Sequence, residues 1–208
     1  MKKINNVTIY ENLKEVIDPE HTCLVVWDVQ NALVERIFNK NEFVENLKNF
    51  IDKMRNKMPV FYTKITPLKS GFQSSWSYYT TMKNFGISAE EASKMPHFMS
   101  KVGTRDIYAV VSPKQEDIVI EKSTASIFIG TDFEQMLRNR NITTIIFSGI
   151  STEIGIESSA RDASNRGFYP VIASDCVSSS DKEAHECSLK ILERMVIVKN
   201  SKEIMANV

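Results

Sequence analysis

Cysteine is scarce in this chain, with only Cys23, Cys176 and Cys187 among 208 residues. An odd number at such wide spacing does not indicate a disulfide framework, and it lacks the close pairing of a zinc site. The three histidines are equally scattered along the chain. We therefore expect no metal, and nothing in the sequence indicates another cofactor.

Several other features are missing, and each absence excludes a class of protein. Acidic and basic side chains balance at 26 each, without a basic stripe interleaved with aromatics, so we expect no nucleic-acid partner. No apolar run approaches the roughly 18 residues of a membrane helix, so we expect no membrane association. The N-terminal residues lack an apolar signal core. The sequence predicts a cytoplasmic protein.

What is present suits one α/β domain over residues 1–208, because a chain of this length with 42% hydrophobic residues can bury a single core. Apolar runs typical of buried parallel strands occupy residues 23–27, 143–147 and 169–173, with shorter ones at 60–63, 118–120 and 195–198. Helical patterns alternate with them at residues 41–57, 131–140, 153–166 and 181–194. This alternation predicts a doubly wound, mainly parallel six-stranded sheet with helices on both faces, a Rossmann-like three-layer arrangement.

The segment from about residue 64 to 112 departs from the alternation, because it contains no clear strand. It is rich in aromatics, namely Phe72, Trp76, Tyr78, Tyr79, Phe85, His97 and Phe98. Such an excursion from a compact domain is typical of a functional lid. Two short helices over the sheet edge, or a subunit interface, would explain it equally well.

Two charged residues follow predicted strands, where open α/β sheets bind their ligands. Asp28 follows the first long strand, where partial burial would raise its pKa and suit it to proton transfer. Position alone also allows a helix cap at Asp28. Lys122 follows a middle strand and could hold an anion or a carboxylate, although an isolated lysine is more often a surface residue.

A third feature is the turn from Gly149 to Gly155, which joins a strand to a helix. The first turn of a helix directs backbone N–H groups outward and can bind an oxyanion or a carboxylate. Taken alone, this segment could equally be an ordinary strand-to-helix connection.

Together the three features resemble the isochorismatase-like hydrolases, also called cysteine hydrolases. That family has Asp-x-Gln after the first strand, a Lys after a middle strand, a Gly-x-x-Thr-x-x-Cys turn and a downstream Thr-Ala-x-Asp-Ala. The corresponding residues here are Asp28-Val29-Gln30, Lys122, Gly149-Ile150-Ser151-Thr152-Glu153-Ile154-Gly155 and Ser159-Ala160-Arg161-Asp162-Ala163. The resemblance extends from about residue 22 to 192, nearly the whole chain.

The resemblance implies a hydrolase, with a glycine where most members carry the attacking cysteine. In cysteine-bearing members the Asp takes the thiol proton, the Lys stabilises the pair and the thiolate forms an acyl-enzyme. Gly155 cannot do this. True isochorismatases also have a glycine there, and their Asp protonates the vinyl ether of isochorismate before water completes the cleavage. By this resemblance Asp28 is the acid, Lys122 its electrostatic partner, and Gly155 a gap that admits the substrate ring.

The same resemblance implies further site positions and an assembly. Its substrate-binding positions correspond to Gln30, Ile150, Ser151, Thr152 and Ile154. It also implies a cis peptide bond at Ile150–Ser151 and a homo-oligomer, a dimer or larger, acting on a small-molecule substrate.

The turn departs from the isochorismatases in one respect, because they carry Tyr and His where this chain has Ser151 and Glu153. This leaves three hypotheses open. The first is Asp28-assisted hydrolysis of isochorismate or a related enol ether. The second is an amide hydrolase that uses water or another nucleophile, for which Cys176 is a minor candidate because a buried cysteine is usually inert. The third is a binding protein without catalysis.

Overall fold

The computed structural model describes residues 1–69, 71–94 and 103–208. Its main sheet has six parallel strands in the order β5-β4-β3-β6-β7-β8. Their bounds are β3 Thr22–Trp27, β4 Val60–Ile65, β5 Ile118–Lys122, β6 Thr144–Ile150, β7 Tyr169–Ser178 and β8 Ile197–Lys199. All six predicted strands are present, so the doubly wound parallel sheet is confirmed.

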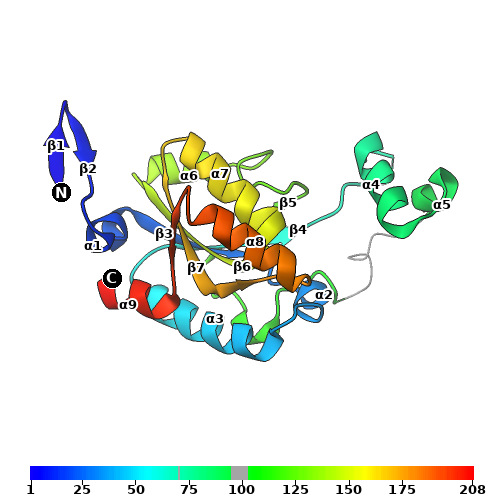
Figure 1. The fold of residues 1–208 in the computed structure, drawn as a ribbon, viewed down its shortest axis with the longest axis horizontal. Coiled ribbons are helices and arrows are strands. Elements are labelled where there is room, and N and C mark those ends of the chain that lie inside the picture. The colour runs from blue at the N-terminus through cyan, green and yellow to red at the C-terminus, as the bar shows by residue number, and fades with distance from the viewer. Residues whose placement is uncertain (70, 95–102) are drawn as a thin grey trace.

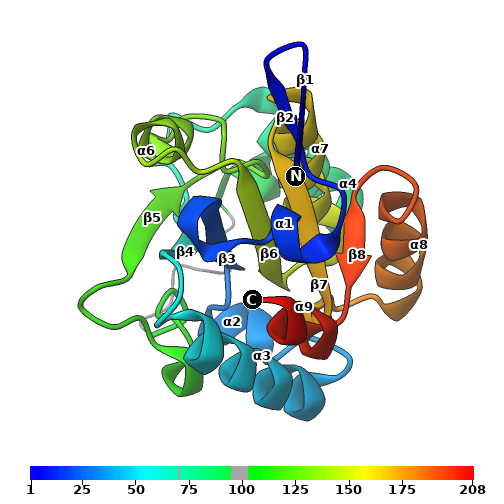
Figure 2. The same ribbon diagram turned by 90° about the vertical axis from the view of Figure 1, so that its left-hand side faces the viewer.

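Helices cover both faces of this sheet, as predicted (Figures 1 and 2). One face is covered by α3 Lys40–Met54 and α9 Ser201–Asn207, and the other by α6 Phe133–Asn139, α7 Glu157–Asn165 and α8 Lys182–Leu192. The shorter helices are α1 Leu13–Val16 and α2 Asn31–Val34. None of the helices in the described ranges is long and apolar enough to span a bilayer.

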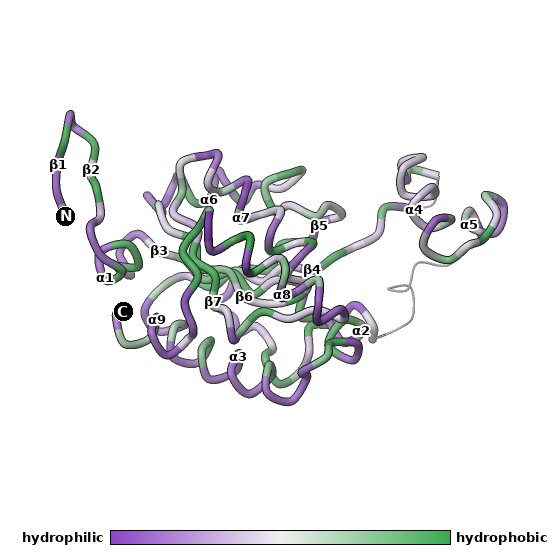
Figure 3. Tube along the Cα trace, viewed as in Figure 1, coloured by the Kyte–Doolittle hydropathy of each residue, from purple (hydrophilic) through white to green (hydrophobic). Residues whose placement is uncertain are grey.

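Alternating side chains of β3 supply the two hydrophobic cores, because successive residues of a strand point to opposite faces. Leu24 and Val26 belong to the core beneath α3, whereas Cys23, Val25 and Trp27 belong to the core beneath α6 and α7. Both sets are essentially without solvent exposure. Figure 3 shows hydrophobic residues concentrated along the central strands, which explains the uninterrupted apolar runs in the sequence.

The strand order places the end of β3 at the point where the chain changes direction across the sheet. From β3 the chain continues outward to β4 and β5, and it then returns to β6 on the other side of β3. Doubly wound sheets bind ligands at the carboxyl edge beside such a reversal. The residues that follow β3, β5 and β6 therefore converge on one region.

The excursion contains two α-helices, α4 Ser75–Phe85 and α5 Ala89–Lys94, a short 3-10 helix at Ala109–Val111, and no strand among its described residues beyond β4. Both helices project away from the sheet (Figure 1), so they do not cover its edge. Trp76 and Tyr79 stack on each other with their ring centroids 5.7 Å apart, and both are exposed. His97 and Phe98 lie outside the described residues.

The sequence analysis missed the short elements. At the opposite end of the molecule from α4 and α5, β1 Lys2–Ile4 and β2 Val7–Ile9 form an antiparallel hairpin (Figure 1). The predicted helix over 153–166 begins as a π-helical turn at Thr152–Ile156 and continues as α7. The N-cap residue of α6 is Asp132, whose side chain makes no capping hydrogen bond, and the hydroxyl of the preceding Thr131 accepts the Phe133 N–H at 3.3 Å.

Candidate active site

Asp28 and Lys122 meet at the carboxyl edge of the sheet and form a buried ion pair. The Lys122 Nζ donates to Asp28 Oδ2 at 2.7 Å, and the two side chains are 1% and 6% exposed. Asp28 follows β3 and Lys122 ends β5, so the lysine side chain reaches across β4. Two of the predicted site residues are therefore in direct contact, and Lys122 is not a surface lysine.

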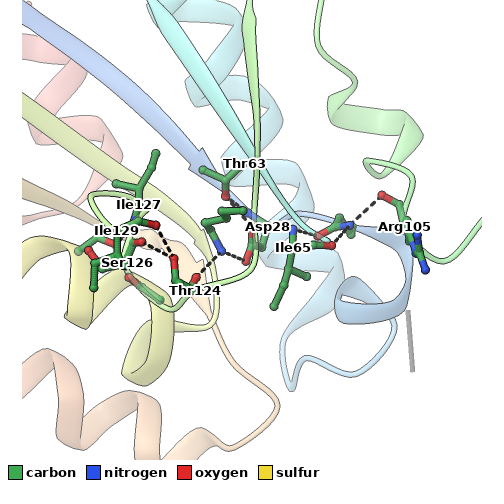
Figure 4. Close-up of polar contacts among 12 residues, drawn as sticks. Asp28, Thr63, Ile65, Arg105, Thr124, Ser126, Ile127 and Ile129 are labelled. Atoms are coloured by element: carbon green, nitrogen blue, oxygen red, sulfur yellow. Dashed lines mark hydrogen bonds and ion pairs between the residues drawn. The ribbon is translucent and has the colours of Figure 1, made fainter. Parts of the chain in front are cut away.

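Thr63 of β4 completes this cluster (Figure 4). Its hydroxyl donates to Asp28 Oδ1 at 2.5 Å and accepts the backbone N–H of Asp28 at 2.9 Å. Asp28 has a left-handed backbone, with φ of +44°, which aspartate tolerates better than most residues. The side chain does not cap α2, whose N-cap residue is Gln30, so the simpler explanation of Asp28 as a helix cap is wrong.

Burial shifts the pKa values of Asp28 and Lys122 in opposite directions. Desolvation raises the pKa of Asp28, and the ammonium of Lys122 and the hydroxyl of Thr63 offset only part of this rise. Desolvation likewise lowers the pKa of Lys122, against the attraction of Asp28. The two pKa values are therefore shifted toward each other, as is common for pairs of groups at sites of proton transfer.

The turn after β6 has the geometry that the family resemblance implied. The peptide bond between Ile150 and Ser151 is cis. The Thr152 hydroxyl donates to the Ser178 carbonyl at 3.2 Å and lies 2.8 Å from Nδ1 of His185. These contacts hold the turn against β7 and α8, so His185 helps to fix the position of the turn.

Gly155 lies in this turn against the indole of Trp27. A β-carbon built on Gly155 would be 2.0 Å from Trp27 Nε1 and 2.4 Å from Cε2, closer than any real contact. The family resemblance implied that Gly155 is a gap that admits the substrate ring. The structure contradicts this expectation, because the indole of Trp27 fills the space beside Gly155.

Trp27 also contacts the lysine of the ion pair. The Lys122 Nζ lies over the indole ring, 4.1 Å from its centroid, and it donates to the Thr124 carbonyl at 3.2 Å. An ammonium at this distance is attracted by the negative face of an aromatic ring. Lys122 is thus held by a carboxylate, a carbonyl and an aromatic face.

The other predicted substrate-binding residues lie in different environments. Gln30 is fully buried, and its amide bonds the backbone of Ile65 and the carbonyl of Arg105, so it orders the loops around the site. Ile150 is buried, whereas Ile154 is 57% exposed. Ser151, which lies between them in the chain, is half-buried.

Alternative nucleophiles find no support in the geometry. Cys176 is fully buried on β7, and burial raises the pKa of its thiol far above the ordinary value. Ser159 donates its hydroxyl to the Gly155 carbonyl at 2.7 Å, which stabilises the turn.

A pocket of about 350 Å³ lies beside the end of β5, where Ser123 and Thr124 line it, but neither Asp28 nor Lys122 is part of its lining. Its walls come from the ends of β4 and β5 and from the start of the excursion, and they include Ile65, Phe72, Ser77 and Thr124. Part of the excursion therefore contributes to a pocket. A wider cleft of about 540 Å³ lies beside the starts of β4 and β5, at the opposite edge of the sheet, and its lining lacks Asp28 and Lys122.

Sequence reasoning missed Thr63 and Trp27 as members of the site. Both were visible only as parts of apolar runs. Their positions along the sequence could have indicated the site, because Trp27 directly precedes Asp28 and Thr63 lies near the end of the neighbouring strand. Among the described residues, no group of three or more His, Cys, Asp or Glu side chains could hold a metal ion.

Comparison with known proteins agrees with this geometry. Residues 22–203 match the isochorismatase domain. YwoC of Bacillus subtilis, an isochorismatase family protein, is 30% identical over 85% of this chain and 87% of its own length. The ureidoacrylate amidohydrolase RutB of Acinetobacter baylyi is 27% identical over 82% of this chain and 76% of its own length. A cysteine hydrolase from Pseudomonas syringae superposes with a TM-score of 0.74 and 19% identity, over 92% and 94% of the two chains. This chain therefore belongs to the isochorismatase family, whose members are hydrolases.

Proposed function

We propose that this chain hydrolyses isochorismate or a related small enol ether without a covalent nucleophile. Protonated Asp28 transfers its proton to the vinyl carbon, which creates an oxocarbenium ion. Water adds to that ion, and the resulting hemiketal breaks down to pyruvate and an alcohol, which returns the proton to Asp28. Lys122 compensates the charge on Asp28 and contacts the substrate carboxylates.

The observation that supports this proposal is the combination of a buried acid with a site that cannot form an acyl-enzyme. Asp28 accepts hydrogen bonds from Lys122 and Thr63, which fix its carboxyl group at the carboxyl edge of the sheet. Gly155 has no side chain, and Trp27 leaves no room for one. Buried charge is costly to retain, so the pair is better explained by chemistry than by stability.

Asp28→Asn is expected to lower kcat on isochorismate by about 10²–10⁴-fold, because the amide cannot donate the proton. Pyruvate release, coupled to lactate dehydrogenase, measures the rate. Asp52→Asn is the matched control, since Asp52 is about half exposed in a surface ion pair with Lys48. Equal rates for the wild type and Asp28→Asn would refute Asp28 as the acid. Absence of wild-type turnover would favour the amide hydrolase or the binding protein.

The pH dependence separates acid from base chemistry at Asp28. If Asp28 is the acid, only its protonated form is active, so kcat falls as pH rises through its pKa. Burial raises that pKa, so the falling limb lies above the ordinary range for aspartate of about 3.9. A profile of kcat against pH, measured between the limits of protein stability, tests this. A rate that increases with pH over the same interval contradicts the acid mechanism.

Amide hydrolysis is the second candidate, and it has support of its own. RutB, named as a ureidoacrylate amidohydrolase, aligns with most of this chain. Glu153 also has a buried carboxylate oxygen, Oε2, with no hydrogen-bond partner, which is a suitable acceptor for an amide N–H. In this reaction Asp28 would act as the base for an attacking water, and activity would rise with pH. Assays of ammonia release from ureidoacrylate and nicotinamide test this candidate.

A further inference from the structure

We propose that the cleft beside the starts of β4 and β5 binds a small carboxylic acid with an apolar body. The cleft measures about 540 Å³, which is within the range of roughly 300–1,000 Å³ that is usual for small-molecule sites. It lies at the edge of the sheet opposite the pair of Asp28 and Lys122. The inference therefore concerns a second site and does not depend on the proposed function.

The position of the cleft allows a ligand to be enclosed from two sides. Its walls come from the residues that follow α3, from the end of α6 and the residues after it, and from the first residues of β4 and β5. The helices α3 and α6 lie on opposite sides of the sheet (Figure 2). A ligand in the cleft contacts both helical layers and so buries much of its own surface, as small-molecule sites require.

Apolar side chains from both walls provide a surface for the body of the ligand. Met58 and Phe61 line the cleft from the β4 side, and Met136 and Ile142 line it from the α6 side. Ile118 is 36% exposed and Met136 is half-buried, so both have apolar surface left to bury. Burial of such surface contributes roughly 25 cal/mol per Å². The unbranched methionines can also adapt to the shape of a ring or a chain.

A buried ion pair forms a fixed polar part of the same lining. Arg55 donates to Asp117 Oδ2 from Nε at 3.0 Å and from Nη2 at 2.8 Å, and Nη2 also donates to the Tyr62 hydroxyl at 2.9 Å. The side chains of Arg55 and Asp117 are 5% and 1% exposed. Nη1, which carries two N–H donors, has only a long contact with Asp52 Oδ1 at 3.5 Å within the described part of the chain. The proposed mechanism does not use this pair, and Arg55 retains donor capacity for a ligand.

The charge that selects the ligand is on Arg140. Within residues 1–69, 71–94 and 103–208, its guanidinium has neither an ion pair nor a hydrogen bond, and Arg140 lines the cleft. A guanidinium binds a carboxylate through two parallel hydrogen bonds. Three basic and two acidic side chains contribute to the lining, namely Arg55, Lys57 and Arg140 against Glu116 and Asp117. Because Arg55 already neutralises Asp117, the remaining charge favours an anion over a cation.

NMR of the protein labelled with ¹³C at its methionine methyl groups tests the cleft directly, without any turnover. Met58 and Met136 line the cleft, whereas Met82 and Met195 lie outside it, and single Met→Leu variants assign the four resonances. The probe is 3-phenylpropionate, and 3-phenylpropanol is its uncharged control. We expect the acid to shift the resonances of Met58 and Met136 in a saturable way, and the alcohol to bind roughly tenfold more weakly.

Three outcomes of this titration would overturn the inference. Unmoved resonances of Met58 and Met136 would show that the cleft does not take the acid. Equal affinities for the acid and the alcohol would show that the carboxylate is not recognised. Shifts of Met82 and Met195 as large as those of the two cleft methionines would show unspecific binding.

Substitutions of charged residues identify the group that binds the carboxylate. Arg140→Gln is expected to weaken the binding of 3-phenylpropionate at least roughly tenfold, because the bidentate charged contact is lost. Arg194→Gln is the matched control, since Arg194 is exposed and does not line the cleft, and its affinity is expected to equal that of the wild type. Glu116→Gln is expected to strengthen binding, because it removes a negative charge from the lining. Unchanged affinity in Arg140→Gln, or weaker binding in Glu116→Gln, would contradict the assignment of a carboxylate ligand to this cleft.

Discussion

Lys122→Met is expected to lower the free energy of unfolding by about 3–5 kcal/mol, because it leaves the Asp28 carboxylate buried without its charge partner. Methionine has nearly the length of lysine and retains contact with Trp27, so the loss reports on charge and not on volume. Urea denaturation followed by circular dichroism measures the change. The exposed pair of Lys48 and Asp52 provides the control, since Lys48→Met is expected to change stability by less than about 1 kcal/mol.

The pH dependence of this loss has a definite sign. Without Lys122, desolvation acts unopposed by the lysine and raises the pKa of Asp28 further. A carboxyl group whose pKa is higher in the folded state than in the unfolded state stabilises the fold when it is protonated. This contribution to the free energy of unfolding is lost as pH rises through the folded-state pKa. The deficit of Lys122→Met should therefore grow with increasing pH. The double variant Asp28→Asn/Lys122→Met, which buries no charge at this site, should recover part of the stability. A constant deficit would contradict the charge explanation.

Gly155→Cys is expected to destabilise the protein by about 1–3 kcal/mol or more without creating an active thiol. The new β-carbon would overlap the indole of Trp27, so either the ring or the turn must move. Trp27→Ala alone is expected to cost about 3–5 kcal/mol through the cavity that it leaves. In the double variant the cysteine has room. The double variant should therefore lose less free energy of unfolding than the sum of the losses of the two single variants. A double-mutant cycle in urea measures this coupling.

Alkylation of the thiol tests the same contact chemically. Every variant carries Cys187→Ser, because Cys187 is exposed whereas Cys23 and Cys176 are buried. In Trp27→Ala/Gly155→Cys the thiol enters the space left by the indole, over which the Lys122 ammonium lies, and we expect iodoacetamide to label it faster than the half-buried Ser158→Cys control. Wild-type stability for Gly155→Cys alone, or equal labelling with and without Trp27, would show that the indole does not occupy the position.

The sheet and the ion pair were predictable because they depend on short-range patterns and on topology. Apolar runs located all six strands, and the carboxyl ends of parallel strands share one edge. Asp28 and Lys122 were therefore expected at that same edge. Helix α9 was not predicted, although Asn200 is followed three residues later by Glu203 and the structure shows a complete capping box there. The shorter α2 has no side-chain cap hydrogen bond at Gln30, and the sequence did not reveal it.

The filled space at Gly155 was not predictable from sequence, because it depends on a contact between two distant segments. Strand alternation assigns Trp27 to the face beneath α7, but it does not determine the direction of the indole or its distance from the turn. Gly149 shows the same limitation. A β-carbon there would be 2.1 Å from the backbone oxygen of Trp27, so glycine is required by the close approach of β3 and β6. Sequence alone presented both glycines merely as members of a motif.

The contact between Trp27 and Gly155 also makes the residues at positions 27 and 155 depend on each other. The space beside the turn holds either the indole or a β-carbon at position 155, but not both. A side chain at position 155 is therefore compatible with this backbone when a smaller residue stands at position 27, and that smaller residue leaves a cavity when it stands alone. Each of the two changes is expected to destabilise the fold by itself, so they are better tolerated together than singly.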